Sequence, residues 1–109
     1  MTYRLISDQA AIAADPGDPE LELMAAAVGA HDPGALVLPC CAAGGTDAKW
    51  FNRLGIACFG FAPERLGNGF DLSRFVHGVD EHVPIDSLAF GARVLDTYLR
   101  TAPSSQETP

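Results

Sequence analysis

Residues 77–82, His-Gly-Val-Asp-Glu-His, place two imidazoles around two carboxylates in a short stretch of the sequence. Histidine and carboxylate side chains bind metals and transfer protons. The spacing differs from the helical His-Glu-x-x-His arrangement, so His77 and His82 need not point to the same place. A loop of solvated charges is the plainer alternative. By itself this segment identifies no reaction.

A second candidate is the stretch Gly44-Gly45-Thr46-Asp47, which follows a short apolar run. Glycines between a buried strand and a helix leave backbone N–H groups that favour a carboxylate, a phosphate or an oxyanion. The alternative is an ordinary turn in which Thr46 or Asp47 caps the helix. The pattern is neither a dinucleotide fingerprint nor a P-loop. The chemistry of this stretch therefore stays open at this point.

The elements around these segments predict an α/β fold. Residues 35–38 and 56–61 are short apolar runs that favour buried strands, and residues 47–54 between them have helical spacing with Gly55 as the C-cap. A strand, a tight glycine loop, a helix and a second strand form a compact βαβ unit. All-apolar strands suit a sheet that is covered on both faces.

Two further helices are predicted on either side of this unit. The first begins with Asp18 as N-cap and Pro19 at the first helical position, and its apolar residues recur at helical spacing (Leu21, Met24 and Val28). The second runs from Asp86 to about Arg100 and is amphipathic, with one apolar stripe (Leu88, Ala92, Leu95 and Leu99). Residues 1–17 are weakly patterned, and residues 102–109 form a polar tail that we expect to be disordered.

Composition limits the classes of partner. The chain has 109 residues, a net charge of −7 and 48% hydrophobic residues, which suit one small globular domain. Its scattered basic residues argue against nucleic acid or an anionic membrane as the main partner. The longest uncharged run, residues 33–46, is too short and too rich in glycine and proline for a membrane span, and no signal peptide is evident.

The three cysteines favour reduced thiols and a cytoplasmic location, because two of them are adjacent and no Cys-x-x-Cys spacing occurs. Cys40 or Cys41 as a nucleophile would need a base, and none is paired with them in the sequence. Packing of small residues at a strand end is the preferred interpretation of both, and Cys58 fits the core of the second apolar run.

Taken together, three blocks resemble the C-terminal part of a family of zinc metallopeptidases and amidohydrolases. The blocks are Gly-Gly-Thr-Asp-Ala-Lys-Trp-Phe, Leu-Gly-Ile-Ala-Cys-Phe-Gly-Phe-Ala-Pro and Phe-Val-His-Gly-Val-Asp-Glu-His-Val-Pro-Ile-Asp-Ser-Leu. The family is that of aminoacylase, carboxypeptidase S, carboxypeptidase G and succinyl-diaminopimelate desuccinylase. The resemblance implies that residues 18–101 are part of a three-layer α/β/α catalytic domain with short, mostly parallel strands.

The resemblance also implies roles for the candidate residues. In the complete family site two zinc ions polarise an amide carbonyl and activate a water molecule, and His77 matches the last metal-binding histidine. Gly44, Gly45, Thr46 and Asp47 match the loop at the substrate end of the cleft. Asp80 and Glu81 follow the family pattern as residues that fix the loop or support the ligand. The implied substrates are small peptides or N-acyl amino acids.

Other family elements have no counterpart in the sequence. It contains neither a His-x-Asp ligand motif nor a Glu-Glu pair, so the general-base Glu is missing and His77 is the one matched ligand. The leading interpretation is a C-terminal fragment of such a hydrolase, inactive alone and prone to self-association through exposed sheet edges. The alternative is a stand-alone, non-catalytic module that associates with a partner.

Overall fold

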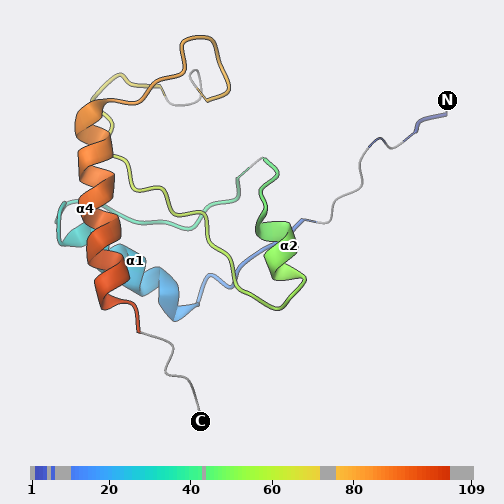
Figure 1. Cartoon of the computed structure of the whole chain (residues 1–109), viewed down its shortest axis with the longest axis horizontal. Coiled ribbons are helices and arrows are strands. Elements are labelled where there is room, and N and C mark those ends of the chain that lie inside the picture. The colour runs from blue at the N-terminus through green and yellow to red at the C-terminus, as the bar shows by residue number, and fades with distance from the viewer. Residues whose placement is uncertain (1, 5, 7–10, 43, 72–75, 104–109) are drawn as a thin grey trace.

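The computed structural model describes residues 2–4, 6, 11–42, 44–71 and 76–103. Within those ranges the regular elements are helices: α1 spans Pro19–Gly29, α2 spans Ala48–Asn52 and α4 spans Ile85–Thr101. Figure 1 shows α4 crossing α1, while α2 stands apart and long irregular segments connect the three helices. No helix in this part of the chain is long and apolar enough to cross a membrane. Residues 104–109 of the expected tail lie outside the described ranges.

The predicted α/β fold is wrong, because no described residue belongs to a strand. The two apolar runs, residues 35–38 and 56–61, follow turns: Ala35 donates its N–H to the Asp32 carbonyl and Ile56 donates to Phe51. Beyond those first residues, neither run makes a backbone–backbone hydrogen bond within the described ranges. A strand exists only when a neighbour takes up its N–H and C=O groups, and composition cannot show whether that neighbour is present. The predicted three-layer α/β/α domain and its exposed sheet edges depended on these strands, so both predictions are wrong for the described residues.

Helix α1 begins as the sequence predicts. Asp18 has extended backbone angles, and its side chain accepts a hydrogen bond from the Glu20 N–H at 2.9 Å. Pro19 opens the helix, where its missing N–H has no intrahelical partner to lose. One face of the helix is buried by Met24, Ala27 and Val28. Local capping and apolar spacing are therefore sufficient to define this element.

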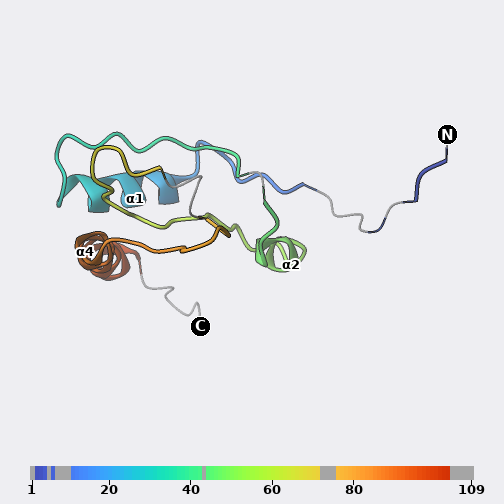
Figure 2. The same ribbon diagram turned by 90° about the horizontal axis from the view of Figure 1, so that it is seen from above.

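The core forms where α1 crosses α4 (Figure 2). Phe90 and Val94 of α4 pack against Ala27 and Val28 of α1, and Val94 has no exposed surface. Half-buried apolar side chains from three parts of the chain extend this cluster (Val37, Phe61 and Tyr98). Each fully buried side chain of this size contributes about 1.5–3 kcal/mol. Two helices far apart in the sequence thus hold the described part of the protein together.

The segment before Arg65 packs closely against α4. A Cβ atom placed on Gly91 would lie 2.6 Å from the Pro63 carbonyl oxygen, so only glycine permits this approach. Next to it, the fully buried Ser87 hydroxyl accepts a hydrogen bond from the Arg65 N–H at 3.1 Å. The Arg65 side chain forms an ion pair with Asp32 at 3.3 Å. This segment therefore ties the end of α1 to the first half of α4.

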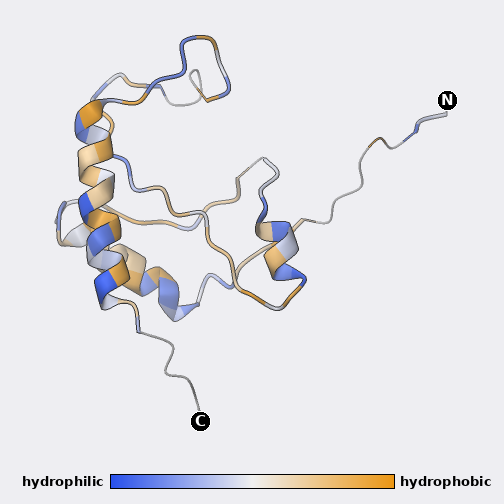
Figure 3. Ribbon diagram, viewed as in Figure 1, coloured by the Kyte–Doolittle hydropathy of each residue, from blue (hydrophilic) through white to orange (hydrophobic). Residues whose placement is uncertain are grey.

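The buried face of α4 differs from the stripe that defines its amphipathic pattern. Leu88 is 56% exposed and Leu99 is 71% exposed, whereas Phe90 and Val94 point into the core. Figure 3 shows apolar bands on α4 and along the irregular segments that precede and follow α2. Among the described residues, exposed large apolar side chains far outnumber the five buried hydrophobic ones. The helix carries more apolar surface than its neighbours cover.

Candidate functional site

The glycine loop leads into α2 as an exposed bend. The Thr46 hydroxyl accepts a hydrogen bond from the Ala48 N–H at 3.2 Å, whereas Asp47 makes no capping bond through its side chain. Gly44, Gly45, Thr46 and Asp47 are all exposed to solvent. Of the two interpretations left open by the sequence, the capping bond to the Thr46 hydroxyl is present, and it leaves the O–H of Thr46 able to donate to another group.

The loop with the two histidines has an unusual backbone. His77 has φ of +58° and Asp80 has φ of +62°, both in the left-handed region that side chains rarely adopt. His82 holds this loop from one side, because its Nδ1 lies 2.6 Å from the Asp80 carbonyl oxygen and its ring meets the Phe70 ring edge-on at 5.7 Å. Left-handed non-glycine residues cost about 1–3 kcal/mol each and cluster at functional sites.

The side chains that the sequence singles out on this loop are exposed to solvent, as are Val76 and Val79. His77, Asp80 and Glu81 are exposed. Within the described ranges, no group of three or more His, Cys, Asp or Glu side chains is placed to hold a metal ion. The donors present therefore do not by themselves fit a zinc ion, which requires about three protein ligands.

The glycine loop and the histidine loop do not form one site in this structure. Figure 1 shows residues 44–47 next to α2 and residues 76–83 before the N-terminal end of α4, so the two loops are well separated from each other. The structure places each predicted residue on an exposed loop, and within the histidine loop the Asp80 carbonyl oxygen contacts the His82 ring.

The cysteines differ from the packing predicted for them. Cys40 and Cys41 are exposed, and all three cysteines are free thiols. Cys58 is half-buried and its thiol donates weakly to the Ile56 carbonyl oxygen at 3.5 Å. The predicted strand-end packing required a sheet, and no residue that the structure describes belongs to a strand. The three thiols remain chemically available.

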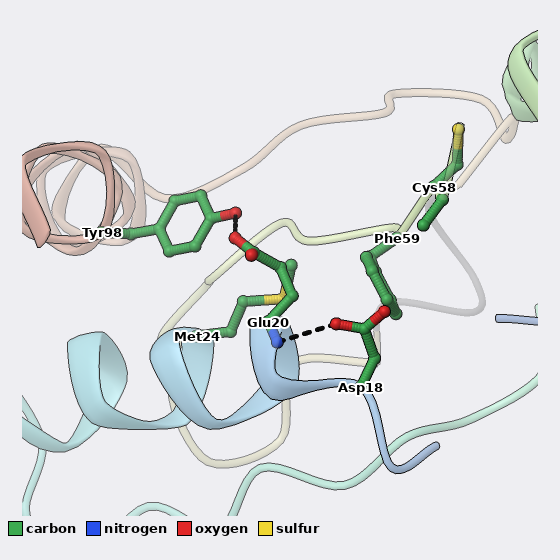
Figure 4. Close-up of a pocket in the computed structure, with 7 residues that line it drawn as sticks. Asp18, Glu20, Met24, Cys58, Phe59 and Tyr98 are labelled. Carbon is green, nitrogen blue, oxygen red and sulfur yellow. Dashed lines mark hydrogen bonds between the residues drawn. The ribbon is translucent and has the colours of Figure 1, made fainter. Parts of the chain in front are cut away.

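A pocket of about 560 Å³ lies where α1, α4 and residues 57–59 meet (Figure 4). Its walls combine two carboxylates, a thiol, a phenol and apolar groups (Asp18, Glu20, Met24, Ala57, Cys58, Phe59 and Tyr98). The Tyr98 hydroxyl donates a hydrogen bond to Glu20, and this bond with a carboxylate raises the pKa of Tyr98 to about 12. Asp18 is occupied by capping α1.

The sequence carries no signal for this pocket. Glu20 is recognisable as a first-turn acid of α1, yet nothing near it in the sequence points to Tyr98, which stands 78 positions later. Residues 57–59 look like part of a strand, not a pocket wall. A contact of such long range is visible only once the two helices are placed together.

The whole sequence was compared with known proteins. The family model described as peptidase family M20/M25/M40 matches residues 2–101. No match is found among curated proteins or among solved structures. The family match spans nearly all of the chain, including the glycine loop and the histidine loop. The chain therefore belongs to peptidase family M20/M25/M40, a family of metal-dependent hydrolases that cleave peptide and related amide bonds.

Proposed function

We propose that this chain carries the C-terminal metal-ligand loop of a zinc-dependent hydrolase that acts on N-acyl amino acids or small peptides. Family membership over residues 2–101 is the observation that carries the proposal. The resemblance of the His-Gly-Val-Asp-Glu block gives His77 the role of the one zinc ligand in this chain. Two observations support that role: His77 is exposed, and it lies on a loop with left-handed backbone angles, a kind of strain that clusters at functional sites.

Asp80 and Glu81 keep supporting roles in this proposal. The Asp80 carbonyl oxygen contacts the His82 ring, so Asp80 takes part in fixing the loop that presents His77. Gly44, Gly45, Thr46 and Asp47 are proposed to contact the substrate through backbone N–H groups. The Thr46 hydroxyl accepts a hydrogen bond from the Ala48 N–H, and its own O–H is proposed to donate to a substrate oxygen.

We propose further that the chain alone hydrolyses nothing. Its sequence contains no Glu-Glu pair and no His-x-Asp motif, so neither a general-base Glu nor the other ligands of the family site can be matched. A zinc ion held by one imidazole is bound weakly. The three free thiols are consistent with the reducing conditions of the cytoplasm, which we propose as the location.

The test is a zinc titration that follows the imidazole signals of the three histidines by NMR. We expect zinc to shift the His77 signals first, in the millimolar range, and His77→Ala to abolish this first event. His82→Ala is the matched control from the same loop, and it should leave a zinc-dependent shift of His77. Zinc binding that is unchanged in His77→Ala would remove His77 from the proposal.

Activity is tested separately with N-acyl amino acids and dipeptides in the presence of zinc. We expect no turnover above the buffer rate. Turnover comparable with that of a complete hydrolase would refute the proposal that the chain is inactive alone.

The alternative, a non-catalytic module that binds a partner, has one observation in its favour: the large amount of exposed apolar surface. The zinc titration separates the two functions, because the module does not need His77 to bind metal. A chain with no zinc response at any histidine and with retained self-association or partner binding would favour the module.

A further inference from the structure

Helix α4 presents three distinct faces. One is buried against α1 and residues 61–65, with Ser87, Phe90, Gly91 and Val94 at its centre. A second is charged and holds an Asp96–Arg100 ion pair of 2.9 Å. The third is apolar and solvent-exposed, and we call it the outer stripe (Ile85, Leu88, Ala92, Leu95 and Leu99). Its large members are exposed by 82%, 56%, 37% and 71% in sequence order.

The spacing of the outer stripe is that of a helix-pairing seam. Its members alternate at intervals of three and four residues through the whole length of α4. This is the a/d repeat with which one helix packs along another. The four large side chains expose on the order of 400 Å² of apolar surface, which equals the largest apolar patch of a typical monomer, a patch that is often functional. The stripe has the geometry of an interface with a second helix.

The arrangement of large and small residues favours another copy of the same helix. Ala92 is central, with Ile85 and Leu99 seven positions before and after it and Leu88 and Leu95 at closely matching intervals. In an antiparallel pair that crosses at Ala92, Ile85 and Leu88 of one copy lie beside Leu99 and Leu95 of the other copy. The small alanines at the centre let the two backbones approach. A surface that complements itself in this way is what a two-fold dimer requires.

The charge of this helix also permits a contact between copies. The chain carries a net charge of −7, which opposes self-association in general. The charged residues of α4 balance, with two acids and two arginines (Asp86, Arg93, Asp96 and Arg100). An antiparallel pair brings the end with Asp86 of one copy beside the end with Arg100 of the other. The net repulsion between two copies of α4 is therefore small.

We propose that the outer stripe of α4 is a homodimer interface, in which two copies pack antiparallel around Ala92. The inference does not depend on the metal or on the hydrolase function. Two such stripes bury about 800 Å² in total, half of the ~1,600 Å² of a standard stable interface. The dimer is therefore weak and reversible, and it forms at high micromolar concentrations of the chain.

The first test is sedimentation velocity of the full chain from low micromolar to millimolar concentration. We expect the sedimentation coefficient of the wild type to rise with concentration. Leu88→Glu and Leu99→Glu should each weaken the dimer at least tenfold. Arg93→Gln makes the same change of one charge unit on the charged face, and Leu54→Glu does so at another exposed leucine, so both should dimerise like the wild type. Far-UV circular dichroism checks that each variant keeps its helices.

The second test locates the two-fold axis by disulfide cross-linking. Cys40, Cys41 and Cys58 are first replaced by serine, and Ala92→Cys or Arg93→Cys is then added. Under mild oxidation Ala92→Cys should give a covalent dimer rapidly, and Arg93→Cys should not. A chain that stays monomeric up to millimolar concentration would overturn the proposal. So would self-association that Leu88→Glu leaves intact, or equal cross-linking at both positions.

Discussion

Tyr98 of α4 donates a hydrogen bond from its hydroxyl to the carboxylate of Glu20 at the start of α1. The same ring meets the Phe61 ring edge-on, with 5.6 Å between centroids. At the other end of α1, the His31 Nε2 lies 2.8 Å from the Thr97 hydroxyl oxygen. The crossing of the two helices is thus held by polar contacts on both sides of its apolar centre.

The Tyr98–Glu20 contact predicts a dependence on alkaline pH. The folded state raises the pKa of Tyr98 to about 12, chiefly because the neutral hydroxyl donates to the Glu20 carboxylate. The unfolded chain ionises near the ordinary tyrosine pKa of about 10, so the stabilisation is complete below that pH and is lost as the pH rises through 12. Glu20→Gln should move the pKa of Tyr98 back toward its ordinary value. Titration of tyrosinate absorbance measures this, with Tyr98→Phe to assign the signal. An unchanged titration in Glu20→Gln would contradict the contact.

Gly91→Ala is expected to destabilise the protein although alanine favours helices. The new Cβ would lie 2.6 Å from the Pro63 carbonyl oxygen, and the backbone must shift to relieve the contact. We expect a loss of about 1–3 kcal/mol, larger than the gain of roughly 1 kcal/mol in helix propensity. Gly29→Ala is the control, because no atom lies within 4 Å of its Cβ position. Urea unfolding should rank Gly29→Ala at or above the wild type and Gly91→Ala below it.

Ser87→Ala tests the buried link between α4 and the Arg65 backbone. The change removes the acceptor of the Arg65 N–H in a place without solvent, which costs about 1–3 kcal/mol. Arg65→Ala keeps that N–H and removes only the exposed ion pair with Asp32, so its cost should be below about 1 kcal/mol. Thermal unfolding of the two variants separates the contribution of the Arg65 N–H bond to Ser87 from that of the Arg65–Asp32 ion pair. A larger loss in Arg65→Ala would reverse this assignment.

Trp50, the one tryptophan of the chain, reports on α2 by fluorescence. The Lys49 Nζ lies 5.3 Å and the Arg53 Cζ 4.7 Å from the centroid of its ring, which is 53% exposed. We expect solvent-like emission, with quenching by iodide much stronger than by caesium because the cations attract the anion. Arg53→Gln should lower iodide quenching and leave acrylamide quenching unchanged. Blue-shifted emission protected from every quencher would contradict an exposed ring.

Prediction from sequence succeeds here where structure is determined by near neighbours. Asp18 and Pro19 define the start of α1. Helix α2 ends at Asn52 with Arg53 as its C-cap, earlier than predicted, and Gly55 adopts φ of +78° in the turn that follows. The prediction of strands at 35–38 and 56–61 is wrong. A strand forms only beside a neighbouring strand, and the apolar composition of a segment does not reveal whether such a neighbour exists. Within α4, the sequence shows an apolar stripe but not which part of the apolar surface α1 covers.

The same distinction applies to the candidate site. The motifs identify His77 and the glycine loop as chemically notable, and both lie within the residues that match the peptidase family. Their relative placement could not be predicted, because the expected sheet would have been the element that brings them together. The left-handed angles at His77 and Asp80 were likewise not predictable, since neither position is the glycine that usually signals them.

The helix crossing at the centre of this fold has a consequence for how quickly the chain folds. Local helices form within microseconds, but α1 and α4 are separated by more than half of the described chain, and their contacts require that long connection to close first. Helical proteins owe their speed to contacts between residues close in sequence, and this one lacks that advantage at its core. Its folding rate should therefore be limited by loop closure and respond strongly to the length of the connection, as in proteins built from β-sheets.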